Sequence, residues 1–293
     1  RYSMNYLQAI IMGIVQGAAE FLPISSSGHL AIFSKIFGLS EPDLTFDILL
    51  HVGTLLAIFI VYWNDIKKLV IEGFGIIGDF FVNAAVFVKK LFTKDNTLKY
   101  RKVVNTSYRK FVMLIIVSTI PTGIIGILVD DIVANVKTNL LIVGVCLLIT
   151  SCLLLISDYV EPGNKKPKSI TYTNAFVIGI CQGFATLPGI SRSGTTITAC
   201  LVSKFDRKLA VKYSFIMSIP AVLGAAVLEL KDFFATIGEC KYLGQYLVGT
   251  LVAAVVGFIC IKVLMILVRN NKFKYFAYYC IAAGAVSIVL HFV

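Results

Sequence analysis

The strongest constraint on the fold is an internal repeat that contains two copies of one broken-helix pattern. The run from Gly13 to His29 aligns without a gap on the run from Gly179 to Thr195, at a constant offset of 166 residues, and 9 of the 17 positions are identical. Each copy begins as an apolar helix, breaks at Pro or Gly, passes through a Ser-rich turn and continues as a second short apolar run. Such a repeat indicates an architecture built from two related halves.

The composition places this chain among membrane proteins. Apolar residues make up 58% of the chain and charged residues 15%, with a mean hydropathy of +0.86, which is outside the range of soluble domains. In a membrane protein, half-length helices broken at matching places in two halves indicate a binding site near the middle of the bilayer. The net charge of +11 would suggest nucleic acid for a soluble protein, but here its distribution along the chain has another explanation.

Six uninterrupted apolar runs are long enough to span a bilayer, at roughly 20 residues per crossing. They are Phe46–Trp63, Phe111–Val129, Leu140–Ser157, Val211–Leu230, Tyr246–Val268 and Tyr275–Val293. The repeated stretches, at about 6–37 and 174–203, differ from these runs because each half-helix is too short to cross. We therefore predict an all-α polytopic membrane protein with six full transmembrane helices, two re-entrant broken-helix hairpins and an inverted-topology repeat.

We expect a single membrane domain over residues 1–293, formed by two intertwined repeats. The first repeat covers about 6–157 and the second about 174–293. A weaker similarity supports this division, because Phe46–Asp65 aligns with Tyr213–Asp232 at an offset of 167. Each half is then one hairpin followed by three spans.

The basic residues predict how the chain is oriented in the membrane. If the hairpins do not cross, one side receives loops with 19 of the 27 Lys and Arg, namely loops 64–110, 158–173, 204–210 and 269–274. The positive-inside rule assigns that side to the cytoplasm, so both termini lie outside, and no nucleic-acid partner is needed to explain the charge. Within the first loop, Ile66–Lys90 is apolar but contains Glu72 and Asp79. This favours a helix in the cytoplasmic interface over a seventh crossing, which would invert everything after it.

Glu20 and Arg192 lie at the breaks of the two repeated segments, and a charged side chain inside a membrane is a candidate for function. One interpretation is an ion pair that only fastens the hairpins together. The other is an anion site, because the Arg192 guanidinium suits phosphate oxygens and helices that begin at both turns would direct free N–H groups at the same place. The turns also supply the hydroxyl groups of Ser25, Ser26, Ser27, Ser191, Ser193, Thr195 and Thr196.

The remaining polar residues favour an anion site over a fastening pair. His29 can act as an acid or base in phosphoryl transfer, and Glu20 can hold a divalent cation or position a nucleophile. The glycines of the turns allow the backbone to approach a ligand closely. Asp47 and His51 lie one turn apart near the outer end of a span, either as a surface pair or as a rim of the site.

These motifs resemble the two signatures of the bacterial undecaprenyl-diphosphatase (bacitracin-resistance) family. They are Gln16-x-x-x-Glu20 followed by Leu22-Pro23-Ile24-Ser25-Ser26-Ser27-Gly28-His29, and Pro188-Gly189-Ile190-Ser191-Arg192-Ser193-Gly194-x-Thr196. The resemblance covers essentially the whole chain. It implies removal of the terminal phosphate from undecaprenyl diphosphate in the bacterial plasma membrane. That reaction regenerates the carrier lipid for peptidoglycan synthesis and confers bacitracin resistance.

Carried over by position, the resemblance implies catalytic roles for Glu20, Ser26, His29 and Arg192. It implies substrate contacts from Gln16, Ser25, Ser27, Gly28, Ser191, Ser193, Gly194 and Thr196. It also implies a divalent cation, Mg²⁺ or Ca²⁺. Because Gln16 stands where many members have Glu, Glu20 is the one carboxylate ligand that we expect for this metal. The expected partners are a polyprenyl diphosphate lipid and the membrane, and a homodimer is left open.

In this interpretation the lipid tail lies between helices, and the head enters a site that opens to the extracytoplasmic side. Ser26 attacks the terminal phosphorus while His29 or Glu20 accepts its proton, with attack by water or by His29 left open. Ser26 and Arg192 occupy equivalent positions of the repeat, which predicts that they face one another. The rival function is a transporter or flippase of polyprenyl phosphate with a midplane anion site. It would explain Arg192 but leave Glu20, Ser26 and His29 without a task.

Overall fold

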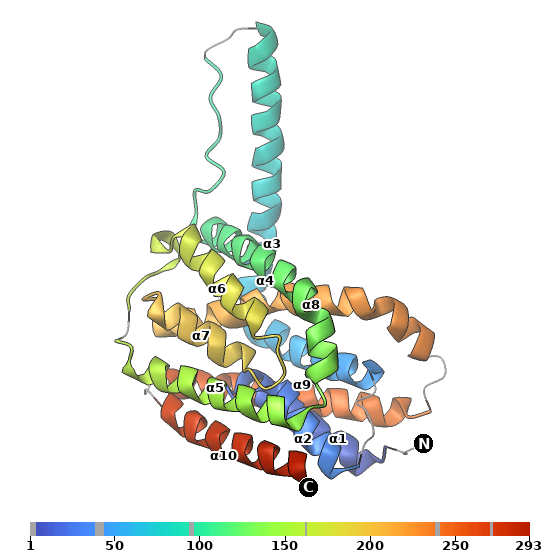
Figure 1. Cartoon of the computed structure of the whole chain (residues 1–293). Helices are drawn as coiled ribbons and strands as arrows, with labels where there is room; N and C mark the ends of the chain where they lie inside the picture. Colours follow the sequence, from blue (N-terminus) through green and yellow to red (C-terminus); the bar gives the residue numbers. More distant parts are fainter. Residues whose placement is uncertain (1–3, 39–43, 94–96, 162, 238–240, 270–271) are drawn as a thin grey trace.

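The computed structural model describes residues 4–38, 44–93, 97–161, 163–237, 241–269 and 272–293 (Figure 1). Within these residues the chain is helical, with no β-strand. The helices are α1 (Tyr6–Phe21), α2 (Ser26–Ile36), α3 (Leu44–Thr93), α4 (Ser107–Val136), α5 (Leu140–Tyr159), the 3-10 turn η1 (Pro167–Ser169), α6 (Tyr172–Phe184), α7 (Arg192–Val202), α8 (Arg207–Ile237), α9 (Leu243–Arg269) and α10 (Phe273–Phe292).

The six predicted spans are confirmed as helices. Each lies in one of α3, α4, α5, α8, α9 and α10, apart from Val293, which follows the end of α10. These six helices are long and apolar enough to cross a membrane. Their mean hydropathies range from 1.6 to 2.9. The chain is therefore a multi-pass, all-α membrane protein.

The two predicted hairpins form the short helix pairs α1–α2 and α6–α7, and each pair is broken within the repeated motif. The breaks follow from local chemistry. Pro23 comes two residues after the end of α1, and Pro188-Gly189 follows α6, where residues of these types do not continue a helix. Ser25 and Ser191 then cap the N-termini of α2 and α7. Their re-entrant course and the inverted topology of the halves stay predictions.

Equivalent helices of the two repeats make equivalent contacts. Helix α1 packs on α9, and its counterpart α6 packs on α4, so the first helix of each hairpin lies against a helix of the other half. A glycine makes each contact close: a Cβ on Gly13 would meet the carbonyl oxygen of Gly249, and a Cβ on Gly179 would meet that of Ser118. Small residues allow this approach between apolar helices, where dispersion contacts supply the attraction. Helices α5 and α10 complete the pattern by packing on each other.

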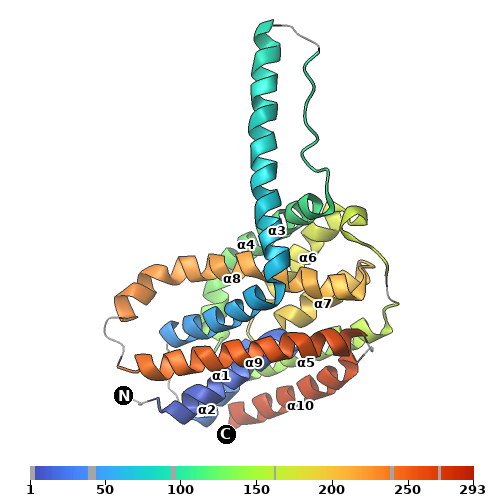
Figure 2. The same cartoon turned by 180° about the vertical axis from the view of Figure 1, so that it is seen from behind.

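Helix α3 contains a kink that the sequence analysis did not predict. Tyr62 leaves the helical region with φ −106° and ψ 18°, and the helix then continues to Thr93. Residues 63–93, here called the arm, run crosswise to α5, α9 and α10 and extend well beyond the bundle (Figures 1 and 2). Ile66–Lys90 is thus helical, as predicted, while its position in the membrane interface stays a prediction.

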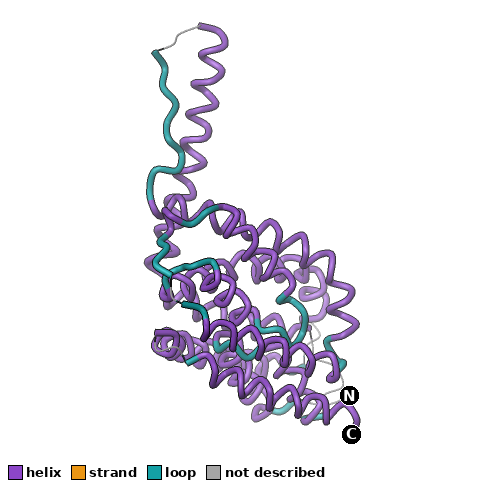
Figure 3. The backbone as a smooth tube through the Cα atoms, turned by 60° about the vertical axis from the view of Figure 1, so that its left-hand side comes forward, coloured by secondary structure: helices purple, strands orange, loops and turns teal. Residues whose placement is uncertain are grey.

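A loop segment returns beside the arm to the start of α4 (Figure 3). The two acids that interrupt the apolar arm pair with Arg101 of this segment and with Arg109 in the first turn of α4. Arg109 contacts Glu72 at 2.8 Å and Asp79 at 2.5 Å, and Arg101 contacts Asp79 at 3.2 Å. These charges therefore serve to hold the returning segment on one face of the arm. Another stripe of the arm leaves large apolar side chains exposed, among them Val70, Phe74, Ile77, Phe81, Val88 and Phe92.

Candidate active site

The two Ser-rich turns meet at the interface between the hairpins. The Ser193 hydroxyl donates to the Leu22 carbonyl oxygen at 3.5 Å. A Cβ on Gly28 would lie 3.1 Å from the Cα of Gly189, and one on Gly194 would lie 3.2 Å from the Cβ of Pro23. Gly28 and Gly194 therefore let the turns approach each other. The sequence predicted instead that glycines of the turns allow the backbone to approach a ligand closely. Their contact with substrate stays a prediction.

The serines that flank Ser26 in one turn and Arg192 in the other make matching hydrogen bonds. Ser25 Oγ accepts from the Gly28 N–H at 3.3 Å, and Ser191 Oγ accepts from the Gly194 N–H at 3.1 Å. The Ser25 and Ser27 hydroxyl oxygens lie 3.3 Å apart, and those of Ser191 and Ser193 lie 3.4 Å apart. These hydroxyl groups shape the turns and hold the first residues of α2 and α7 in place.

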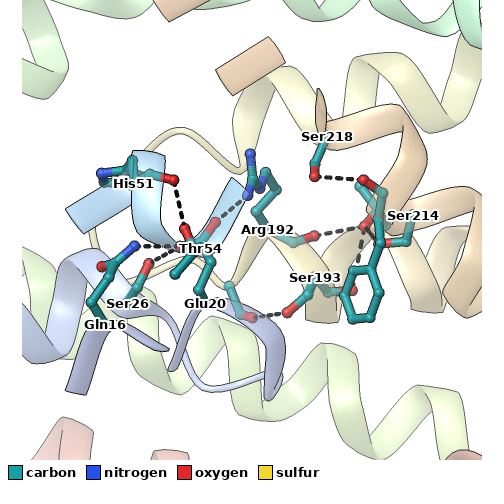
Figure 4. Close-up of polar contacts among 12 residues, drawn as sticks. Gln16, Glu20, Ser26, His51, Thr54, Arg192, Ser193, Ser214 and Ser218 are labelled. Atoms are coloured by element: carbon teal, nitrogen blue, oxygen red, sulfur yellow. Dashed lines mark hydrogen bonds and ion pairs between the residues drawn. The ribbon is translucent and has the colours of Figure 1, made fainter. Parts of the chain in front are cut away.

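The centre of the site is the carboxylate of Glu20, near the end of α1 (Figure 4). Ser26 Oγ donates to its Oε2 at 2.6 Å, and Gln16 Nε2 donates to the same oxygen at 3.1 Å. The Arg192 guanidinium forms an ion pair with its Oε1. The exposed fraction is 6% for the Glu20 side chain and 22% for that of Arg192, so the pair is largely enclosed, with Arg192 its more accessible member.

This arrangement agrees with the prediction that Ser26 and Arg192 face each other. Ser26 is the first residue of α2 and Arg192 is the first residue of α7, and the two side chains approach one carboxylate from opposite hairpins. A hydroxyl bonded to a carboxylate at 2.6 Å makes a strong charge-assisted hydrogen bond. Its geometry lets Glu20 accept the Ser26 proton without a change of rotamer. The contact between Glu20 and Arg192 alone would hold the hairpins together. The additional hydrogen bond from Ser26 is not needed for that structural role.

Two predicted site residues point elsewhere. His29 stacks on Tyr279 of α10 with ring centroids 5.4 Å apart, and its Nε2 lies 2.8 Å from the Tyr279 hydroxyl. Its Nδ1 lies 2.8 Å from the Ser25 carbonyl oxygen, so both ring nitrogens have partners outside the Glu20 cluster. Thr196 is buried, and its hydroxyl lies 2.5 Å from that of Ser214 on α8. The roles of His29 in catalysis and of Thr196 in phosphate binding stay predictions.

Of the two residues that were expected to form either a surface pair or a rim of the site, His51 lies near the Glu20 cluster. Figure 4 draws it on α3 with the Glu20 cluster, one turn before Thr54, whose hydroxyl donates to the His51 carbonyl oxygen at 2.9 Å. Tyr279 and Ser214 were missed by the sequence analysis. Tyr279 lies 250 residues from His29, and Ser214 lies on α8, 18 residues after Thr196. Both are outside the repeated motifs, so the motif pattern held no signal for them.

The potential metal ligands of the site offer partial support for a bound divalent cation. Among the described residues, no three His, Cys, Asp or Glu side chains cluster to form a metal site by themselves. Gln16 is fully buried, however, and its Oε1 has no hydrogen-bond partner in the described part of the chain. An amide oxygen and one carboxylate are ligands that Mg²⁺ or Ca²⁺ accepts when substrate phosphates supply the others. Gln16 and Glu20 are therefore compatible with a cation that binds together with a diphosphate.

A comparison with the models of known protein families matches residues 9–286 to the family described as "Bacitracin resistance protein BacA". The chain belongs to this family. The match to the BacA family includes both Ser-rich turns and every residue of the Glu20 cluster.

Relatives with curated names cover almost the whole chain. Proteins named "Undecaprenyl-diphosphatase" from Halothermothrix orenii and Methanosphaera stadtmanae are 39% and 40% identical to it over 287 and 288 residues, which is 98% of each chain. One with the same name from Desulforapulum autotrophicum is 39% identical over 291 residues, covering 99% of this chain and all of that protein.

Proposed function

We propose that this protein hydrolyses undecaprenyl diphosphate to undecaprenyl phosphate and inorganic phosphate. This recycles the carrier lipid of cell-wall synthesis and confers bacitracin resistance. Its membership of the BacA family and the names of its relatives support this substrate and reaction. The observation that carries the proposal is the convergence of Ser26 and Arg192 on Glu20, at the first residues of two helices. A hydroxyl, a base and a fixed cation together can cleave a phosphoric anhydride by covalent catalysis.

The contacts suggest a two-step reaction. Ser26 Oγ forms a bond to the terminal phosphorus, the bond from phosphorus to the bridging oxygen breaks, undecaprenyl phosphate leaves, and the serine proton passes to Glu20. Water then displaces Ser26 from phosphorus, Glu20 returns its proton to the serine oxygen, and inorganic phosphate leaves with one proton released to solution. Arg192 and the N–H groups at the starts of α2 and α7 stabilise the charge of the transferring phosphoryl group.

Glu20 rather than His29 is the base in this mechanism. The Glu20 carboxylate is within hydrogen-bond distance of the Ser26 hydroxyl. The His29 ring nitrogens have other partners, because Nδ1 is hydrogen-bonded to the Ser25 carbonyl oxygen and Nε2 to the Tyr279 hydroxyl. Distance to the proton is the first requirement for a general base. His29 then positions α2 against α10, which keeps Ser26 at the start of its helix.

A divalent cation would be held by Glu20 Oε1 or Oε2 and Gln16 Oε1, together with the diphosphate. When bound, it would neutralise negative charge on the substrate phosphates. Arg192 would then exchange part of its contact with Glu20 for phosphate oxygens, because a guanidinium has more N–H donors than one carboxylate can accept.

Phosphate release by the purified protein in detergent micelles tests the proposal, because no transport can be measured there. We expect release from undecaprenyl diphosphate and loss of release after chelation of divalent cations. A pure transporter would release no phosphate under any of these conditions. Release that survives complete chelation would remove the cation from the proposal but leave hydrolysis in place.

We also propose that the basic loops face the cytoplasm, with both termini and the entrance to the site on the outer side. The charge distribution supports this orientation. A cysteine at Asp131 should react with a membrane-impermeant thiol reagent in intact cells, and one at Lys168 only after the cells are opened. Cys240, which lies outside the described residues, is replaced by Ser for this experiment. The reverse pattern of labelling would invert the orientation.

A further inference from the structure

A cavity of about 300 Å³ lies where the arm leaves the bundle, away from the Glu20 cluster. Its walls come from four segments far apart in the sequence: the arm, the first turn of α4, the turn η1 and the first turns of α8. None of Gln16, Glu20, Ser26 and Arg192 lines it. The proposed hydrolysis therefore does not account for this cavity.

The lining combines an apolar floor with a basic rim. Leu69 and Phe111, which are 8% and 4% exposed, form part of the floor. Lys166, Lys208 and Lys212 bring three positive charges to the same cavity. This pairing of apolar surface and clustered cations suits a ligand that is both lipid and anion.

Nearby acids leave part of this positive charge available. Lys212 is paired with Asp65 at 2.5 Å. Asp206 also lines the cavity, and its Oδ1 accepts from the Leu209 N–H at 3.2 Å at the start of α8. Lys166 and Lys208 are exposed, and in the described part of the chain neither lies within ion-pair distance of a carboxylate. The ammonium groups of Lys166 and Lys208 can therefore bind an anion.

The position of the cavity indicates where such an anion would come from. Three of the four basic loops that we assign to the cytoplasmic side contribute to its walls. Beside it, the arm exposes large apolar side chains such as Phe74 and Phe81, as expected for a helix at a bilayer surface. The mouth of the cavity would then lie at the depth of the lipid headgroups, where anionic phospholipids attract basic side chains.

We propose that this cavity binds the headgroup of an anionic glycerophospholipid from the cytoplasmic leaflet. The lipid phosphate contacts Lys166 and Lys208, and the glycerol and the first methylene groups lie against Leu69 and Phe111. A cavity of this volume is at the lower end of small-molecule sites, which suits a headgroup rather than a whole lipid. The bound lipid joins the base of the arm to α8.

Native mass spectrometry of the full chain in detergent tests this site with phosphatidylglycerol as the probe and phosphatidylcholine as the uncharged comparison. The test variant is Lys166→Gln with Lys208→Gln. The matched control is Lys168→Gln with Lys274→Gln, which removes the same charge from two exposed lysines outside the cavity. We expect the test variant to bind phosphatidylglycerol at least about 10-fold more weakly, and the control to bind it like the wild type.

Three outcomes would overturn the proposal: wild-type affinity in the test variant, an equal loss in the control, or equal binding of both lipids to the wild type. Glycerophosphoglycerol, the headgroup without acyl chains, should compete poorly; if it competes as well as the intact lipid, the cavity is a site for soluble anions instead. Both variants should release phosphate from undecaprenyl diphosphate at the wild-type rate. This readout separates a failure of the lipid site from a failure of the proposed hydrolysis.

Discussion

Replacing Ser26 with alanine is expected to lower the turnover of undecaprenyl diphosphate by at least about 10³-fold, because it removes the attacking oxygen. Ser26 Oγ lies 2.6 Å from the Glu20 carboxylate, which accepts its proton in the proposed mechanism. Glu20 and Arg192 remain in place in this variant, so the lipid should still bind. The measurement is the initial rate of phosphate release, together with the dissociation constant for the lipid.

Ser27→Ala is the matched control for Ser26→Ala. Ser27 neighbours Ser26 on α2, and its hydroxyl contacts Ser25 rather than Glu20, so its loss should only weaken turnover. Ser25→Ala removes an N-cap and should cost about 1 kcal/mol of stability as well as some activity. If Ser26→Ala retains near wild-type turnover, Ser26 is not the nucleophile and water or His29 must take that role.

Changing Arg192 to lysine is expected to reduce turnover by at least about 10²-fold, on the scale of losing one oriented charge stabiliser. Lysine keeps the positive charge but loses the planar fork that can contact Glu20 and a phosphate together. The loss should appear in kcat as well as in KM, because an oriented guanidinium stabilises the charge distribution of the transition state more than that of the bound substrate.

Arg207→Lys provides the control for Arg192→Lys. Arg207 is likewise the first residue of a helix, and it donates to the Val268 carbonyl oxygen at 3.2 Å, remote from Glu20. The Arg207→Lys substitution should leave the rate of phosphate release close to the wild-type rate. Near-normal release by Arg192→Lys, with a lowered melting temperature, would instead support a fastening role for the Glu20–Arg192 pair.

The elements of this fold were predictable because local chemistry determines them. The breaks between α1 and α2 and between α6 and α7 follow from Pro, Gly and capping Ser, and the spans follow from the length of the apolar runs. The kink at Tyr62 was not predictable. No Pro or Gly marks it, so it reflects how α3 packs in the bundle rather than a local preference.

The site was predictable to the extent that the repeat relates its residues. Because 166 residues separate Ser26 from Arg192 as they separate the two motifs, the repeat predicted that these residues face each other across the hairpins. The orientation of His29 was not accessible in this way. Its partner Tyr279 is 250 residues away on α10, and spacing within a motif carries no information about a contact over that distance.

The most direct test of the central claim, that Ser26 forms a covalent intermediate, is the stereochemical course at the terminal phosphorus. The substrate would carry a terminal phosphate made chiral with sulfur and oxygen isotopes, and the released thiophosphate would be analysed after hydrolysis in labelled water. Each in-line displacement inverts phosphorus, so two successive displacements through Ser26 predict net retention of configuration. Net inversion would show a single direct attack by water and would contradict the mechanism.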